Sequence, residues 1–357
     1  MWLSALVGNL RPEQVNLLVV FEHCGELVHL VRDKGHRVRV LVRTATGAGA
    51  KAGFLGLAVS LARLLKSERI EGPKLIVHWS PRAHVYGTVA RILARHPART
   101  VWIQHVRPSG FWLHRLASRF PATAVVCVSS ATARQQRLLY PRTRPVVLHP
   151  GTDRRPRQRD ATTHRRLGIP EDGHVVGLVG RIEPWKGQDL LIRAIGVLRD
   201  WGLPVHALLI GETCSAAWPE FSSKVLALVA ELGLQQDVTF TGHLTDIGFA
   251  LSDCDVAVCA SREEGFGLGV VEAMAAGVPV VATRCGGPED ILEDGVSGIL
   301  VPVGDVDRLA EGIRRLLEDP EMAARLAAAA RQAYAERFTA ERSAAAFLRL
   351  IQALAED

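Results

Sequence analysis

The stretch Ser261–Gly287, SREEGFGLGVVEAMAAGVPVVATRCGG, decides the fold of this chain. Residues 256–260 in front of it are apolar, too few for a helix and bounded by polar residues, which predicts a buried strand. After a glycine-rich loop, residues 268–276 have the composition of a short helix, which Gly277 ends. Residues 278–283 are a second apolar run. The stretch therefore predicts strand, loop, helix and strand, the repeating unit of an α/β fold.

The loop of this stretch contains three glycines, Gly265, Gly267 and Gly269. Because they have no side chain, they let the backbone turn tightly and bring its N–H groups close to a ligand. At the start of a helix, free N–H groups and the helix dipole both attract negative charge. The sequence therefore predicts an anion site here, and phosphate is its first candidate ligand.

Two carboxylates bracket the loop, Glu264 just before it and Glu272 in the helix that follows. Carboxylates repel phosphate but accept hydrogen bonds from pairs of hydroxyl groups. A phosphate site between two groups that bind hydroxyls matches the structure of a nucleotide sugar, which has ribose on one side of its phosphates and hexose on the other. The pattern EGFGL…VEAMAAGVPVVAT, with seven residues between the glutamates, resembles the E-x7-E signature of the family 4 type (group 1) glycosyltransferases, retaining enzymes of the GT-B fold.

Length and composition limit the class of the protein. A chain of 357 residues suits two domains of about 150 to 200 residues each. The chain has no run of 18 apolar residues, and its start, MWLSALVGNLRPEQ, lacks the basic flank and long apolar core of a signal peptide. We therefore expect a cytoplasmic protein. The six cysteines are scattered without metal-binding spacings, which predicts reduced thiols and no zinc site.

Charge is distributed unevenly along the chain. Residues 1–160 hold 26 Lys and Arg against 8 Asp and Glu, which leaves 17 against 29 for the remainder. A basic half attracts anionic lipid headgroups, phosphorylated acceptors or nucleic acid. The simpler interpretation is a basic surface that is only solvated.

Both halves of the chain alternate short apolar runs with helical patterns, which predicts parallel sheets covered on both faces. The expected strands are 15–20, 37–42, 75–78, 100–103 and 124–128, then 175–179, 205–210 and 238–241. The sequence His149-Pro150-Gly151, followed by basic residues, is typical of a linker between domains. We predict an α/β protein of the GT-B class, with two doubly wound Rossmann-like domains facing each other across a ligand-binding cleft.

The predicted domains have different tasks. The resemblance implies that residues 1–152 form an N-terminal, acceptor-binding domain and that residues 153–338 form a C-terminal domain that binds the nucleotide sugar. The resemblance to GT-B enzymes implies that the helix within residues 339–357 crosses back to the first domain.

A second motif supports the family resemblance. The segment GRIEPWKGQDLL resembles the family's GR…KG motif, whose Arg and Lys bind the donor diphosphate, and this assigns that role to Arg181 and Lys186. A leaving nucleoside diphosphate accumulates negative charge, which a guanidinium and an ammonium stabilise without a metal. We therefore expect no essential metal and no cofactor beyond the nucleotide-sugar donor.

The resemblance also assigns the remaining site residues. Glu272 would hold the ribose hydroxyls, and Glu264 would bind the donor sugar near the reacting centre. His105, in TVWIQH, matches the family histidine at the end of a first-domain strand, close to the transferred sugar. Backbone groups of four residues would contact hexose and phosphate, and a turn would border the base: these are Gly265, Phe266, Gly267 and Leu268, then Gly242 and His243.

Two segments of the first half depart from simple patterns. The family has a glycine pair after the first strand, which contacts donor or acceptor phosphate, whereas FEHCGE here keeps only Gly25 on the acceptor side. The segment 107–120, RPSGFWLHRLASRF, mixes basic and aromatic residues. It suits either a helix that dips into an anionic membrane or a helix docked on its own domain.

Together these motifs predict a hexosyltransferase, which moves a sugar from a nucleoside diphosphate donor such as a UDP-sugar to a hydroxyl group, and the family resemblance implies that it is a retaining enzyme. The acceptor class stays open among glycolipid, polysaccharide and natural-product precursor. Retention would follow from front-side attack, in which the leaving phosphate oxygen helps to deprotonate the acceptor.

Other functions are compatible with parts of this sequence. An inactive nucleotide-sugar-binding regulatory protein and a GT-B sugar-nucleotide epimerase stay open. GFGLG lacks the spacing of a dinucleotide site, although Arg284 leaves room for an NADP enzyme. A nucleic-acid binder would explain the basic half but not the glutamates. Two D-x-D pairs, residues 253–255 and 305–307, are better explained as a strand entry and a helix cap than as a metal motif.

Overall fold

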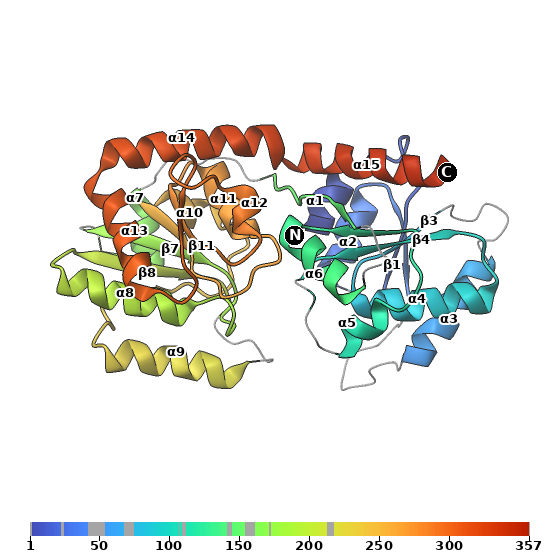
Figure 1. The fold of residues 1–357 in the computed structure, drawn as a ribbon, viewed down its shortest axis with the longest axis horizontal. Coiled ribbons are helices and arrows are strands. Elements are labelled where there is room, and N and C mark those ends of the chain that lie inside the picture. Colours follow the sequence, from blue (N-terminus) through green and yellow to red (C-terminus); the bar gives the residue numbers. More distant parts are fainter. Residues whose placement is uncertain are drawn as a thin grey trace. The chain divides into compact units, whose positions relative to one another are not determined.

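The structure is a computed structural model that describes residues 2–22, 25–41, 54–67, 75–106, 108, 112–140, 145–153, 161–170, 173–212 and 218–356. The chain divides into two compact units (Figure 1). The first consists of Met1–Gly151 and Ala340–Asp357, and the second of Thr152–Thr339.

In the described residues of the first unit, all strand pairs are parallel. Its elements are α1 (Trp2–Asn9), β1 (Leu18–Phe21), α2 (Glu26–Asp33), β2 (Arg37–Val40), α3 (Phe54–Ser67), β3 (Leu75–His78), α4 (Pro81–Ala94), β4 (Arg99–Gln104), α5 (Trp112–Ala117), β5 (Ala124–Cys127), α6 (Ser130–Leu139), β6 (Val146–Val147) and α15 (Ala340–Glu356). Strand β1 pairs with β2, and a separate sheet has the order β3-β4-β5-β6. Apolar residues of α4, α5 and α6 share one core with β4 and β5, so these helices cover the same face.

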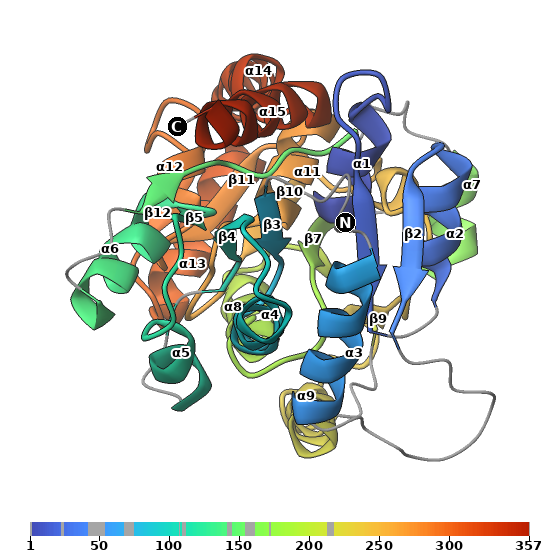
Figure 2. The same ribbon diagram turned by 90° about the vertical axis from the view of Figure 1, so that its right-hand side faces the viewer.

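Helix α1 was not predicted from the sequence. It is eight residues long, is too short to be stable alone, and packs against α15 from the other end of the chain (Figures 1 and 2). Its buried face consists of Trp2, Leu6 and Val7. Tertiary contacts with distant residues therefore stabilise this helix, and a local pattern could not reveal them.

The second unit is built, as far as its residues are described, on one parallel sheet of six strands. Its elements are α7 (Ala161–Leu167), β7 (His174–Val179), α8 (Gln188–Asp200), β8 (Val205–Ile210), α9 (Pro219–Glu231), β9 (Val238–Phe240), α10 (Gly248–Ser252), β10 (Val256–Cys259), α11 (Leu268–Ala276), β11 (Val280–Thr283), α12 (Pro288–Ile291), β12 (Ile299–Val301), α13 (Val306–Glu318) and α14 (Pro320–Arg337). Residues of α8, α9 and α13 form the main core against one face of the sheet.

The strand order locates a crevice in this sheet. The order is β12-β11-β10-β7-β8-β9, so the chain builds outward from β7 in one direction and then returns to add β10 on its other side. In open α/β sheets, ligands bind outside the carboxyl ends of the strands where the order reverses. The loops that follow β7 and β10 flank this position, and both were singled out by sequence motifs.

Most predicted elements exist, with shifted ends. Strand β11 begins at Val280 rather than at Val278, because the Val278 N–H still bonds to the Ala273 carbonyl and closes the end of α11. Both D-x-D pairs have structural roles: Asp255 accepts a bond from the Val175 N–H, and Asp305 caps α13 through the Arg308 N–H, each at 2.9 Å or less.

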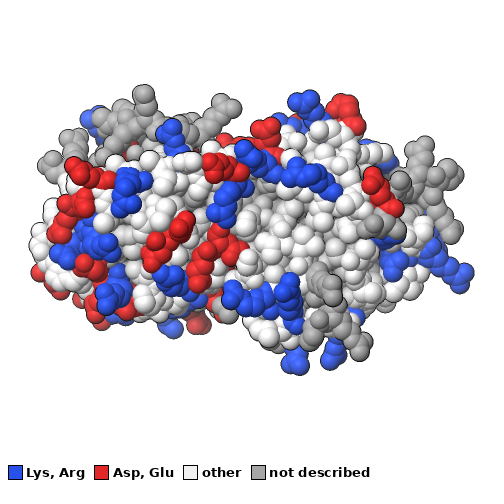
Figure 3. Space-filling view, turned by 45° about the horizontal axis from the view of Figure 1, so that its top comes forward, with Lys and Arg blue, Asp and Glu red and all other residues white. Residues whose placement is uncertain are grey.

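Charge differs between the units as their compositions predict. On the face drawn in Figure 3, acidic side chains are frequent over the second unit at the left, and basic side chains predominate over the first at the right. Parts of three segments discussed above lie outside the described residues, namely His23 and Cys24, Arg107 with residues 109–111, and the basic residues 154–160.

Candidate active site

The loop between β7 and α8 carries the first basic residue predicted for the site. The side chain of Arg181 is 63% exposed, and its Nη2 lies 2.8 Å from the buried carboxylate of Glu183. The Gln188 side chain donates to the Arg181 carbonyl at 2.8 Å. The backbone of Arg181 is therefore held in place while its guanidinium stays accessible to an anion.

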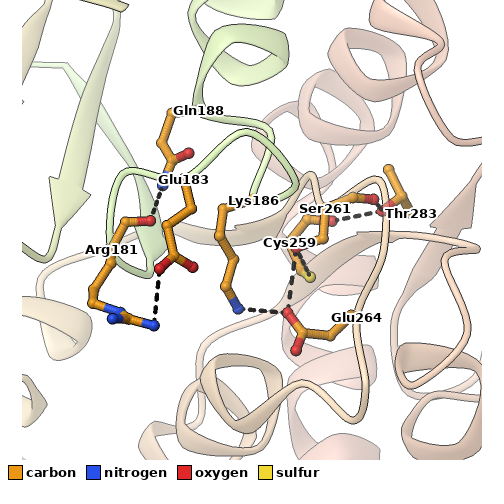
Figure 4. Close-up of polar contacts among 8 residues, drawn as sticks. All are labelled: Arg181, Glu183, Lys186, Gln188, Cys259, Ser261, Glu264 and Thr283. Carbon is orange, nitrogen blue, oxygen red and sulfur yellow. Dashed lines mark hydrogen bonds and ion pairs between the residues drawn. The ribbon is translucent and has the colours of Figure 1, made fainter. Parts of the chain in front are cut away.

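Lys186 lies deeper in the same loop and pairs with Glu264. Its Nζ is 2.6 Å from Glu264 Oε2, and the two side chains are only 23% and 15% exposed (Figure 4). Burial alone would lower the pKa of Lys186, but the neighbouring Glu264 carboxylate outweighs burial and raises it. Lys186 is therefore a fixed ammonium at neutral pH.

Glu264 is held through its backbone and its side chain. Its N–H donates to the Cys285 carbonyl at 3.3 Å, and its own carbonyl accepts from the Gly287 N–H at 3.1 Å. The Ser261 hydroxyl donates to Glu264 Oε2 at 3.4 Å. These bonds connect the loop after β10 to the segment after β11, so the carboxylate has one defined position beside Lys186.

Two helices begin at this crevice without a side-chain cap among the described residues. Gly187 is the N-cap residue of α8 and Gly267 that of α11, both with left-handed backbone, φ 73° and 114°. A Cβ on Gly187 would collide with the Ala260 carbonyl, and one on Gly269 would lie 3.3 Å from the Val179 carbonyl. Glycine therefore permits both helix starts to approach the strand ends closely.

A cavity lies at this position in the sheet. The polar residues and glycines that line it come from β7, β10, the loops that follow these strands and α11, and include Lys186, Cys259, Ser261, Glu264, Gly267 and Gly269. Uncapped helix N-termini and an ammonium are the groups that bind phosphate. These groups favour a negatively charged ligand beside the Glu264 carboxylate, which can accept hydrogen bonds from hydroxyl groups.

Arg262 connects the two loops and was not singled out from the sequence. Its guanidinium forms two bonds to the Asp189 carboxylate, at 2.9 and 2.6 Å, and a third to the Pro184 carbonyl at 3.1 Å. The hydrogen bonds to Asp189 raise the pKa of Arg262. No local pattern pairs residues 73 positions apart, so only the fold reveals this connection.

Other predicted donor residues occupy different surroundings. Glu272 lies within α11 and is 1% exposed. Phe266 is buried with its ring 5.9 Å from that of Phe338, while Leu268 is the first residue of α11 and Gly265 lies in the loop. Gly242, with φ 68°, and the exposed His243 follow β9 at the same edge of the sheet.

The first unit contains the remaining predicted residues. Gly25 precedes α2 as its N-cap and is exposed. In the same atypical loop, Glu22 contacts Arg82 of α4 at 3.6 Å. His105 follows β4 directly and is surrounded by aromatic rings.

The described residues were also compared with the requirements of a metal site by their side-chain types, and none of the site residues above belongs to a cluster of metal ligands. They contain no group of three or more His, Cys, Asp or Glu side chains arranged to hold a metal ion. Independence of the reaction from metal stays a prediction, based on the positive charges of Arg181 and Lys186.

Comparison with known proteins identifies the family. Residues 160–333 match the family model described as Glycosyl transferases group 1. The second unit belongs to this family. The match contains Arg181, Lys186 and both glutamates of the E-x7-E pattern, and it confirms the resemblance predicted from these motifs.

Relatives of this glycosyltransferase domain carry a common name. A D-inositol 3-phosphate glycosyltransferase of Saccharomonospora viridis is 36% identical over 210 residues, which are 57% of this chain and 48% of that protein. One from Salinispora arenicola is 37% identical over 177 residues, 48% of this chain and 40% of that protein. The chain therefore spans about half the length of the curated relatives it matches.

Solved structures extend the similarity to both units. The crystal structure of Anabaena Alr3699/HepE in complex with UDP and glucose has a TM-score of 0.85 and 25% identity, covering 99% of this chain and 95% of that one. Its complex with UDP-glucose has a TM-score of 0.84 and 26% identity, covering 98% and 95%. Together with the parallel sheets, this confirms the predicted α/β fold of the GT-B class. Within the described ranges, no helix has the length and apolarity to cross a membrane.

Proposed function

We propose that this chain is a glycosyltransferase that transfers a hexose from a nucleoside diphosphate sugar, with UDP-glucose as the first candidate donor, to a hydroxyl acceptor. The observation that carries the proposal is the grouping of Lys186, Glu264 and two uncapped helix N-termini at the strand reversal of a group 1 domain. The similar structure with bound UDP-glucose supports uridine as the base.

The site residues have the following roles in this proposal. The diphosphate lies at the N-termini of α8 and α11, with Lys186 and the accessible Arg181 balancing its charge. On binding, Lys186 exchanges its carboxylate partner for phosphate oxygen, which leaves Glu264 to accept hydrogen bonds from the hexose hydroxyls. Glu272 holds the ribose. Both cations stabilise the leaving diphosphate as its charge develops, so no metal is needed.

The acceptor hydroxyl attacks from the face that the diphosphate leaves, and a leaving phosphate oxygen takes its proton, which retains the anomeric configuration. His105 of the first unit acts close to the transferred sugar. The names of the relatives support a cyclic polyol, free or phosphorylated, as one acceptor class beside glycolipids and polysaccharides. Residence in the cytoplasm, with peripheral contact between the basic first unit and an anionic membrane, completes the proposal.

The first experiment measures thermal stabilisation by UDP-, GDP-, ADP- and dTDP-sugars in EDTA, because a ligand that binds only the native state raises Tm. We expect UDP-glucose to raise Tm of the wild type and of Lys224→Ala, a control that removes an exposed lysine of α9. Lys186→Ala and Glu272→Ala should each weaken donor binding about 10- to 100-fold, since each removes a charged hydrogen-bonding group.

The second experiment follows transfer to an acceptor panel that includes inositol and its 3-phosphate, with the anomeric configuration read by NMR. Inversion in the product would contradict the proposed mechanism. Tight donor binding with neither transfer nor donor hydrolysis would favour the regulatory alternative. Stabilisation by NADPH or nucleic acid, with none by any nucleotide sugar, would overturn the proposed function.

A further inference from the structure

An aromatic cluster surrounds His105 in the first unit. The Trp79 ring, which follows β3, has its centroid 5.0 Å from that of His105. The Trp2 ring of α1 lies 5.3 Å from His105 with its plane at 78°, and 5.1 Å from Trp79. Three rings from three separate segments of the chain are therefore in mutual contact at the carboxyl ends of β3 and β4.

Trp2 is anchored by hydrogen bonds to the opposite end of the chain. It is 4% exposed, and its indole N–H donates to Ser343 Oγ of α15 at 2.9 Å. Ser343 Oγ in turn donates to the His149 carbonyl at 2.9 Å. On the other side of the cluster, Phe347 of α15 has its ring 6.5 Å from Trp79. Helices α1 and α15 thus fix the tryptophan that packs on His105.

The surroundings determine the protonation of His105. Burial lowers the pKa of His105, and although a hydrogen bond to the Trp79 backbone opposes this effect, the pKa falls to about 4. The side chains in the cluster are uncharged. Since Nε2 is buried and has no partner among the described residues, the bond to the Trp79 carbonyl comes from Nδ1–H. At neutral pH, Nε2 therefore carries a lone pair that can accept a hydrogen bond.

We propose that Trp2 and Trp79 are positioning residues that hold the His105 ring in one orientation and one tautomer, and that sugar transfer depends on this orientation. This inference rests on the proposed function, because it assigns His105 a task in sugar transfer. It extends the active site's supporting structure to α1, whose eight residues precede the first strand. A histidine that acts close to the transferred sugar must be oriented well, since small displacements of such a group reduce the rate of transfer strongly.

The test titrates His105 in the full chain by NMR of 13Cε1-labelled histidine, with His105→Asn to assign the signal. Trp2→Ala removes the ring and admits water, so we expect the pKa of His105 to rise by about 1 unit or more, toward 6.5. Trp2→Phe keeps a ring and should restore most of the wild-type value. Ser343→Ala loosens the anchor and should have an intermediate effect. Trp112→Phe, on the exposed face of α5, is the matched control and should leave the pKa of His105 unchanged.

Transfer kinetics give a second, independent readout. We expect Trp2→Ala to reduce kcat about 10-fold with little change in KM for the donor, because the donor diphosphate binds to the second unit. An unchanged His105 titration in Trp2→Ala, or an equal change in Trp112→Phe, overturns the inference. A wild type that binds UDP-glucose without transferring sugar contradicts the proposed function instead, while the titration still decides whether Trp2 holds the ring.

Discussion

At the scale of single residues, the ion pair between Lys186 and Glu264 joins the two motifs that the sequence offered separately. Each residue was assigned by its own motif, GR…KG or E-x7-E, and both assignments need only local sequence. That the two side chains contact each other at 2.6 Å follows from the adjacency of β7 and β10, which no spacing in the sequence expresses.

The first prediction concerns the charge of Lys186 when its partner is removed. In Glu264→Gln, burial acts on the ammonium without the opposing carboxylate, so the pKa of Lys186 falls. The cation that binds diphosphate is then lost as pH rises. We expect the Kd of UDP in this variant to rise about 10-fold between pH 7 and pH 9, because binding becomes weaker, and the Kd in the wild type to stay nearly constant.

Isothermal titration calorimetry at both pH values measures this difference. Glu263→Gln is the matched control, because Glu263 is the exposed neighbour of Glu264. Equal pH dependence of UDP binding in wild type and Glu264→Gln would show that Glu264 does not keep Lys186 charged.

At the scale of elements, the start of α8 depends on a single backbone conformation. The apolar spacing in GQDLLIRAI is typical of a helix, in agreement with the position of α8. The reason that glycine is required became visible only in the structure, where the Gly187 Cα faces the Ala260 carbonyl of the neighbouring loop.

The second prediction compares two glycines with nearly the same left-handed backbone. Gly187 and Gly202 flank α8 with φ 73° and 78°, but only Gly187 has atoms within 4 Å of an added Cβ. In Gly202→Ala, the strain of a left-handed alanine lowers the free energy of unfolding by about 1 kcal/mol. In Gly187→Ala, the collision of the new Cβ with the Ala260 carbonyl adds to this strain. We therefore expect the free energy of unfolding to fall by about 2 kcal/mol more than in Gly202→Ala, and UDP to bind at least 10-fold more weakly.

Thermal denaturation and UDP titration of both variants measure the difference. Equal losses of Tm, with UDP binding intact in Gly187→Ala, would mean that the loop after β10 moves aside and that the close approach is unimportant.

At the scale of the whole molecule, buried histidines divide unequally between the units. His78 and His84 of the first unit share a hydrogen bond of 2.9 Å between their Nδ1 atoms, and His84 stacks on Trp102. Burial lowers the pKa of His78 to about 3 and that of His84 to about 4, with His105 also about 4. In the described part of the second unit, burial lowers the pKa of His206.

The third prediction is that acid unfolds the first unit before the second. The folded pKa values lie below the unfolded value of 6.5, so the unfolded chain binds more protons as pH falls. Stability is therefore complete above about pH 6.5 and is lost toward pH 4. For each of these histidines, the free energy of unfolding falls by about 1.4 kcal/mol per pH unit in this range.

Hydrogen exchange at pH 7 and pH 5, corrected for intrinsic rates, measures this order. Amides of α4 and β4 should lose protection at pH 5, while those of β7 and β10 keep it. His29→Asn removes an exposed histidine of α2 and should follow the wild type. Loss of protection in β7 at the same pH as in β4 would contradict the prediction.

The sequence by itself determined what short-range patterns encode. Glycine positions, apolar runs of strand length and two motifs predicted the alternation of strands and helices, the family of the second unit and the residues Arg181, Lys186 and Glu264. These features depend on neighbours within about 10 residues, and backbone geometry and helix periodicity act over that range.

The tertiary structure decided what depends on long-range contacts. The order of strands around β7, the bonds of Arg262 to Asp189, and helix α1 with Trp2 against His105 all join residues that are far apart in the sequence. Their stability comes from burial and hydrogen bonding between elements, which exist only after the chain has folded. For this reason the motifs predicted which residues bind the donor, while the packing decided which residues hold them in place.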